Sequence, residues 1–252
     1  METNSLCQYL NWDSDFFGFR IARITVNRLS QKDLEGVKKW CDLNSIDCLY
    51  FLCDSTDAAT VEIAQDNQFR LVDIRLTLEK QISDIPIEEN TIIQAVVRRS
   101  ELDDVSTLRA IARVCHHDSR FYYDSNFPSF RCDELYEKWI EKSCNGYADV
   151  VLIAEFQGRP VGYITCILLD QAKGQIGLFG VDPRLHNKGL GQKLLNESLR
   201  WFVQQEVRQV TVVTQGRNLR AQRLYMNCGF LTCSLQLWYH HWFIQKRAKG
   251  EE

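Results

Sequence analysis

Apolar and polar positions recur along most of the chain with the spacing of strands and amphipathic helices. Ser30 stands before an amphipathic stretch that runs to about Leu43, and serine is a typical helix N-cap. The N-terminal part has the order β-α-β-α-β, with strands expected at 18–26, 48–53 and 69–78 and helices at 30–43 and 56–67. This pattern predicts a small α/β domain over residues 1–80.

A second, larger domain is expected after a break in the periodicity. Residues 81–91 contain Pro86 and no regular pattern, which indicates a linker. Ser100 and Asp103 have the spacing of a capping box for the helix that follows. The elements expected between 92 and 245 are strands at 92–98, 149–156, 160–170, 174–181, 208–214 and 230–243 and helices at 101–115, 131–143, 189–205 and 218–227. The charged tail, 246–252, is expected to fray.

Two segments share a spacing that points to an internal repeat. Ser55 to Phe69 spans the same fourteen steps as Gly216 to Phe230, and both segments follow a buried strand and predict a short helix. Either the N-terminal domain is a degenerate copy of the second half of the other domain, or two β-α-β units resemble one another by chance. In a copy the chemistry has been lost, because Asp57, Ala64 and Gln68 stand where Asn218, Tyr225 and Gly229 stand.

Composition narrows the possible partners. The chain has 252 residues, 45% hydrophobic and 25% charged, with a net charge of −3, so neither nucleic acid nor a membrane surface is an expected partner. The first residues lack the pattern of a secretory signal, and no apolar run reaches the ~20 residues of a membrane span. The ten cysteines have no zinc-site spacing, so we expect reduced thiols, no metal and a cytoplasmic location.

A glycine pair between an apolar strand and an amphipathic helix is the first chemical signal. Gly189 and Gly191 remove side chains where a helix begins, and unpaired N–H groups at a helix N-terminus suit a phosphate. Lys188 adds a positive charge. A plain strand-to-helix turn is the alternative, because a lone G-x-G is weak. Downstream, Asn218-x-x-Ala221-x-x-Leu224-Tyr225 leads into a helix with a phenol on one face.

These residues resemble two motifs of the GCN5-related N-acetyltransferase (GNAT) family. The stretch 186–191 is similar to the Q/R-x-x-G-x-G/A signature, with His186 at the place of the usual Gln or Arg. The resemblance implies an α/β fold of α+β type over 92–245, with a mixed sheet, a splayed pair of strands near Val181 and Val213, and a bulge at Gly180. It also implies acetyl-CoA as the donor. The residues that it assigns to CoA are Phe179, Gly180, Val181, His186, Asn187, Lys188, Gly189, Leu190, Gly191, Gln192, Asn218, Ala221 and Leu224.

Tyr225 is the expected catalytic residue. A phenol of pKa ~10 can protonate the departing thiolate, and a backbone N–H near Val181 can polarise the thioester carbonyl. The alternative is a tyrosine that only packs on its helix. The base that removes the proton of the acceptor amine stays open among His116, His117, Asp118, Glu155 and a water relay.

Two aromatic segments with carboxylates suggest the acceptor. Residues 10–18 and 118–128 can stack a flat base and bind a phosphate or sugar hydroxyl, or they can simply cover the sheet. Both resemble the TDP-fucosamine acetyltransferase branch of the family, which implies N-acetylation of a nucleotide-linked 4-amino-4,6-dideoxyhexose for a surface polysaccharide. The residues expected to contact this substrate are Trp12, Asp13, Phe17, Asp118, Arg120, Phe121 and Tyr122.

Other readings remain open at this point. The acceptor can instead be a protein N-terminus or a small amine, or the protein can be a non-catalytic acyl-CoA or nucleotide-sugar sensor. The aromatic strand at 235–243 is expected to form a sheet edge that pairs in a homodimer.

Overall fold

The computed structural model describes residues 6–82 and 95–243, and these contain ten strands and seven α-helices. They form two compact units, one of residues 6–75 with 235–243 and one of residues 76–82 with 95–234. The strand that begins after residue 230 is therefore divided between the units, although the sequence pattern placed it wholly in the second domain. The predicted linker beyond residue 82 and the charged tail lie outside the described residues. No helix in these ranges has the length and apolar character needed to span a bilayer.

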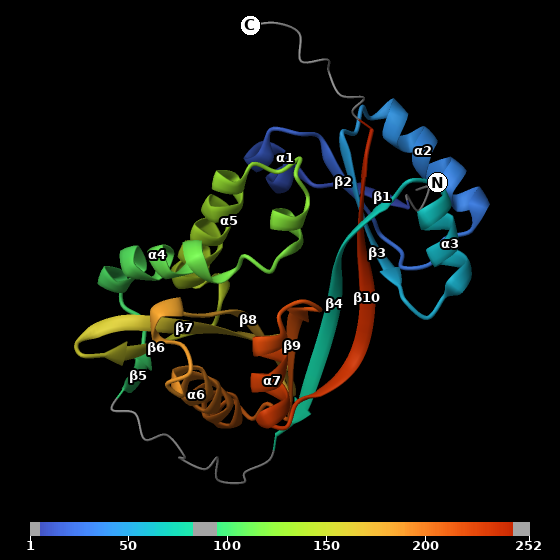
Figure 1. The fold of residues 1–252 in the computed structure, drawn as a ribbon. Helices are drawn as coiled ribbons and strands as arrows, with labels where there is room; N and C mark the ends of the chain where they lie inside the picture. The colour runs from blue at the N-terminus through green and yellow to red at the C-terminus, as the bar shows by residue number, and fades with distance from the viewer. Residues whose placement is uncertain (1–5, 83–94, 244–252) are drawn as a thin grey trace, which may run out of the picture. The chain divides into compact units, whose positions relative to one another are not determined.

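The first unit is a sheet with its two longer helices packed on one face. Its elements are β1 (Cys7–Tyr9), α1 (Asn11–Phe17), β2 (Ile21–Ile24), α2 (Gln31–Leu43), β3 (Cys48–Asp54), α3 (Ala58–Asp66), the first half of β4 (Arg70–Gln81) and most of β10 (Leu231–Trp242). Its strand order is β1-β2-β3-β10-β4 (Figure 1). Leu34, Phe51 and Tyr239 belong to the buried cluster between α2, α3 and the sheet. The Ser30 cap is confirmed as a capping box with Asp33.

Helix α1 was not predicted. The segment Trp12–Gly18 is helical rather than a loop, and it ends at Gly18, whose φ of 76° is left-handed and suits glycine. Phe17 is buried on this helix, whereas Trp12 is 44% exposed and stacks on Phe16. Periodicity alone does not reveal this helix, because it is short and two carboxylates lie between its apolar residues.

The second unit places helices on both faces of a mixed sheet. Its elements are β5 (Val96–Arg99), α4 (Val105–Cys115), α5 (Ser129–Lys142), β6 (Val150–Phe156), β7 (Arg159–Leu168), β8 (Lys173–Val181), α6 (Leu190–Gln204), β9 (Gln209–Gln215) and α7 (Leu219–Asn227), with parts of β4 and β10. The strand order is β10-β4-β9-β8-β7-β6-β5. Helices α4 and α5 cover one face, and α6 and α7 cover the other. The mixed α/β fold is as predicted.

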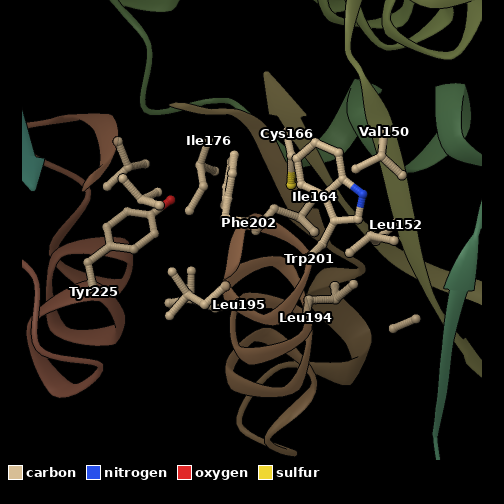
Figure 2. Packing of buried hydrophobic residues seen from close by; sticks show 14 of the residues in the cluster. Val150, Leu152, Ile164, Cys166, Ile176, Leu194, Leu195, Trp201, Phe202 and Tyr225 are labelled. Carbon is tan, nitrogen blue, oxygen red and sulfur yellow. The ribbon is translucent and has the colours of Figure 1, made fainter. Parts of the chain in front are cut away.

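The main core of the second unit lies under α6. Figure 2 shows Leu194, Leu195 and Phe202 of α6 directed at Ile164 and Ile176 of the sheet. All five are buried. Burial of large apolar side chains contributes about 1.5–3 kcal/mol each, so this interface holds α6 firmly against the strands.

Two local predictions were wrong. The capping box uses Glu101 and Asp104 rather than Ser100 and Asp103, because the Asp104 carboxylate accepts the Glu101 N–H at 2.8 Å. Strand β10 is also not an edge, because it lies between β3 and β4. Its aromatic residues alternate between two covered faces, and Tyr239 and His240 are each 1% exposed.

The predicted splay between two strands is confirmed, but the bulge lies elsewhere. Strands β8 and β9 pair in parallel only as far as Ile176 with Val212, although β8 continues to Val181. In the β7–β8 ladder, Thr165 faces two residues, Gly177 and Leu178, so the bulge is there and not at Gly180. The Thr165 hydroxyl accepts the Leu178 N–H at 2.7 Å, which satisfies the displaced amide.

The two segments with equal spacing have equivalent geometry. The carbonyl of Ala64 accepts the N–H of Phe69 at 3.0 Å, and the carbonyl of Tyr225 accepts that of Phe230 at 3.0 Å. The residue before each phenylalanine has a left-handed φ, 62° at Gln68 and 82° at Gly229. The helix ends at Ser45 and Glu206 have the same geometry, with φ values of 49° and 61°. This geometry therefore does not distinguish an internal repeat from a chance resemblance, and the repeat stays a prediction.

Two glycines allow a matched test of this packing. A methyl group at Gly174 would overlap the ring of Phe202, whereas one at Gly36 in α2 would meet nothing within 4 Å. We expect Gly174→Ala to lower the free energy of unfolding by about 1–3 kcal/mol through overpacking. Gly36→Ala should raise it by about 0.5–1 kcal/mol, since alanine loses less backbone entropy in a helix. Urea unfolding of both variants measures the difference; an equally stable Gly174→Ala variant would contradict the packing.

Candidate active site

The end of β8 directs backbone groups into the splay. The Asp182 N–H donates to the Val161 carbonyl at 2.8 Å. This bond shows which residues of β8 direct their backbone N–H and C=O groups at β7. Because hydrogen-bonded and non-hydrogen-bonded pairs alternate, Gly180 faces Tyr163, while Phe179 and Val181 direct their N–H and C=O groups away from β7. Beyond Ile176 the register with β9 has ended. The strand therefore presents backbone donors and acceptors at a place where an extended ligand can pair with them.

The N-terminus of α6 is open toward solvent. Gly189 is its N-cap with a left-handed φ of 79° and supplies no side-chain cap, and Asn187 before it has a φ of 62°. The first helical bond goes from Lys193 N–H to the Gly189 carbonyl at 3.0 Å. The N–H groups of Leu190, Gly191 and Gln192 are thus the orphan donors of a 15-residue helix, and they suit an anion. Lys188 beside them is exposed.

Gly191 has a packing role in addition. A Cβ atom there would lie 3.3 Å from Leu224 of α7 and 3.7 Å from Phe179 of β8. The residue therefore lets the start of α6 approach both elements closely. This contact brings the open N-terminus of α6 next to the splayed part of β8.

The side chains of His186 and Asn218, which we expected to contact CoA, form hydrogen bonds within the protein. His186 Nε2 lies 2.8 Å from the Val181 carbonyl, so the imidazole turns back to β8. The Asn218 side chain accepts the Ala221 N–H at 3.0 Å and caps α7. The cap fixes the start of the helix that carries Tyr225 two turns later. Contacts of these residues with CoA stay predictions.

Tyr225 is a buried phenol of α7. It is 4% exposed, and its ring lies 6.2 Å from that of Phe179 and 5.8 Å from that of Phe230. Figure 2 shows the ring leaving α7 toward the side of the cluster that holds Ile176 and Leu195. Burial raises the pKa of Tyr225 above that of a free phenol, so it is protonated at neutral pH.

The four candidate bases occupy different settings. His116 lies 2.7 Å from the Tyr163 hydroxyl and stacks on Tyr136, and burial lowers the pKa of His116 to about 3. Glu155 is held by Arg98 at 2.8 Å. His117 is exposed and lies 3.8 Å from a carboxylate oxygen of Asp133, and Asp118 is half-buried. None of these positions identifies the base.

The aromatic segment at 118–128 is tied to the start of α7. Arg217 donates to the Asp118 carbonyl at 3.2 Å, and its guanidinium lies 3.6 Å from the centre of the Tyr123 ring. Sequence reasoning missed Arg217, although it directly precedes the Asn218 motif. Phe121 is buried, and the Tyr122 hydroxyl donates to Asp133 at 2.7 Å.

Of the other predicted substrate residues, Arg120 stacks on Phe121 at 4.3 Å from the ring centre. Trp12, Asp13 and Phe17 all lie on α1 in the first unit. Phe17 and Phe121 are buried, so other side chains form the exposed surface of the segments 10–18 and 118–128. A role in substrate binding stays a prediction for this set.

Known proteins share both sequence and fold with the chain. Residues 111–230 match the model of the Acetyltransferase (GNAT) family. The spore coat polysaccharide biosynthesis protein SpsD of Bacillus subtilis (strain 168) is 30% identical over 149 residues, 59% of this chain and 51% of that protein. The match thus spans about half the length of this relative. The dTDP-fucosamine acetyltransferase of Escherichia coli O6:H1 is 22% identical over 95% of this chain and 100% of that enzyme.

A solved structure gives the same result for the fold. The GCN5-related N-acetyltransferase from Sphaerobacter thermophilus has a TM-score of 0.65 and 15% identity, covering 94% of this chain and 76% of that chain. The family match falls on the residues that carry the splay, the open helix N-terminus and Tyr225. The motifs, the family model and the fold agree, and residues 111–230 are the part of the chain that matches the GNAT acetyltransferase family.

Proposed function

We propose that the protein is an acetyl-CoA-dependent N-acetyltransferase of the amine of a nucleotide-linked 4-amino-4,6-dideoxyhexose. The observation that carries the donor assignment is the open N-terminus of α6 beside the unpaired end of β8. The acceptor assignment is supported by the dTDP-fucosamine acetyltransferase, which the chain matches over nearly its whole length.

The residues present fit a CoA thioester. The N–H groups of Leu190, Gly191 and Gln192 would hold the pyrophosphate, with Lys188 adding charge. The backbone groups of Phe179 and the N–H of Val181 would face the pantetheine arm along the splay, since the Val181 carbonyl already has two side-chain partners. Acetyl-CoA supplies an activated acetyl group, and its thioester would lie near the Val181 N–H, which can polarise the carbonyl.

In this arrangement Tyr225 completes the transfer. The acceptor amine forms the new C–N bond, the C–S bond breaks, and Tyr225 gives its proton to the departing sulfur. The amine loses one proton to solvent or to a base, and Tyr225 recovers its own from water. A buried phenol held in its neutral form is suited to this step, since burial raises the pKa of Tyr225 and keeps its proton available near neutral pH.

Removing the Tyr225 hydroxyl tests the acid. We expect Tyr225→Phe to lower kcat by about 10²–10⁴-fold while leaving the Kd for CoA unchanged, because the ring and its packing remain. Since its pKa is raised, activity in the wild type should not fall through Tyr225 ionisation below pH ~10. Tyr239→Phe, an equally buried tyrosine of the first unit, is the control and should keep full activity. A fully active Tyr225→Phe variant would exclude the acid role, and a wild type that binds CoA without turnover would favour a sensor.

The contacts of Arg217 predict an effect on the acceptor alone. Arg217→Ala should raise the KM for the acceptor several-fold, because the loop at 118–123 loses its anchor to α7. The KM for acetyl-CoA should stay within a factor of two. Arg220→Ala, at an exposed position on α7, is the matched control. Equal effects of both variants on both substrates would show that general surface charge, and not the anchor, is responsible.

The substrate class is tested by thiol release from acetyl-CoA. The acceptors are dTDP-4-amino-4,6-dideoxygalactose, its gluco epimer, UDP-linked 4-amino sugars and several peptides with free N-termini. We expect turnover on one nucleotide sugar and none on the peptides. Turnover on peptides alone would overturn the acceptor assignment and favour a protein N-terminus.

A further inference from the structure

One backbone carbonyl at the end of β8 receives two side-chain donors. The Val181 carbonyl oxygen lies 2.8 Å from His186 Nε2 and 3.2 Å from Cys115 Sγ. A carbonyl can only accept, so the proton of His186 is on Nε2. Burial raises the pKa of the Cys115 thiol to about 12, so the thiol also remains a donor at neutral pH.

These two donors come from opposite directions in the sequence. Cys115 is the last residue of α4, on the face of the sheet where Tyr163 covers Gly180. His186 belongs to the turn after β8, which also contains the ion pair of Asp182 with Arg184 at 2.6 Å. Together they fix the peptide that follows Val181 from the sheet side and from the turn side.

We call these two hydrogen bonds to the Val181 carbonyl the clamp. It lies between the splay of β8 and the start of α6. Val181 directs its N–H and its C=O to the same side of the strand, toward the splay. A bare carbonyl there would repel the oxygen of a thioester that approaches the neighbouring N–H. Two protein donors neutralise this acceptor. Three residues after His186, Gly189 begins the helix whose N–H groups suit a phosphate.

We propose that His186 is a positioning residue that acts on the acyl donor through the Val181 peptide, not through a contact with phosphate, and that Cys115 shares this role. The inference rests on the acetyl-CoA site of the proposed function, but not on the identity of the acceptor. It gives a reason for a histidine where the family signature has Gln or Arg. The imidazole reaches back to close the β8–α6 turn.

A donor without phosphates separates the two roles. Wild type and His186→Ala are assayed with acetyl-CoA and with S-acetylpantetheine, which lacks the pyrophosphate and nucleotide. We expect kcat/KM to fall about 3- to 10-fold with both donors, the effect of one lost net hydrogen bond. Lys188→Ala is the matched control and should lose activity with acetyl-CoA alone. A His186→Ala variant that loses activity only with acetyl-CoA would show a phosphate contact and overturn the proposal.

The second readout needs no donor. Hydrogen exchange of the peptide covering 181–190 should be faster in His186→Ala than in wild type, because the turn has lost its clamp. His186→Gln, whose amide can donate to the same carbonyl, should restore both the exchange protection and the turnover. Unchanged exchange in His186→Ala would contradict the clamp.

The shared carbonyl predicts coupling between the two donors. Removing one leaves the other in place, so the double variant His186→Ala/Cys115→Ala should lose more activity than the product of the single losses. Cys115→Ser keeps a donor and should resemble wild type. A loss of activity in the double variant equal to the product of the two single losses would show that the two side chains do not act through the same carbonyl.

Failure of this inference and failure of the proposed function give different results. Hydroxylamine serves as the acceptor in the His186 and Cys115 assays, with its rate in the absence of enzyme subtracted, so this comparison does not depend on a sugar. If no nucleotide sugar is turned over while His186→Ala behaves as expected, the acceptor assignment fails and the clamp stands. If a nucleotide sugar is turned over but His186→Ala equals wild type, only the clamp fails.

Discussion

The site depends on one extra residue in β8. Because Gly177 and Leu178 share the place opposite Thr165, the second half of the strand is shifted by one position relative to its first half. The displaced amide of Leu178 is satisfied by the Thr165 hydroxyl. After it, β8 follows β7 and leaves β9, and a strand edge opens inside a sheet that would otherwise be continuous. Edges normally invite pairing with another strand; in the proposed function the pantetheine arm takes that place.

The proposed donor site is made mostly of main chain. The splay offers backbone groups of Phe179 and Val181, and α6 offers the first N–H groups of its helix. Side chains serve mainly to hold this main chain in place: Asn218 caps α7, and His186 and Cys115 bind one carbonyl. Such a site tolerates substitution at the first position of the family signature, since the backbone can make the same contacts when another side chain holds the turn.

Regular features could be predicted from the sequence, and irregular ones could not. Periodicity located the strands and helices of the second unit to within a few residues, because each buries one continuous apolar face. The bulge was misplaced, since Gly177 and Gly180 are equally good sequence candidates and only the ladder with Thr165 distinguishes them. Helix α1 was missed because its polar residues hide its short apolar face.

In the candidate site, too, only the residues that belong to a sequence motif could be predicted. The glycines and Tyr225 could be found because a motif fixes their spacing, whereas no spacing along the chain reveals the contacts of Arg217 and Cys115. Strand β10 was taken for an edge because a run of aromatic residues does not tell whether one or both sides are paired. Neighbours in space, not along the chain, decide such questions.

The division of β10 between the units has a consequence for the order in which the protein can be assembled. In the first unit β3 pairs with β10, so that Cys48 is opposite Trp242 and Phe51 is opposite Tyr239. During synthesis, the N-terminal unit therefore has an open position in its sheet until residues 235–242 have left the ribosome. Contacts of such long sequence separation form slowly, and an unpaired strand edge is prone to aggregate while it waits. The late arrival of β10 leaves the edge of β3 unpaired for most of synthesis, although the N-terminal unit is made first.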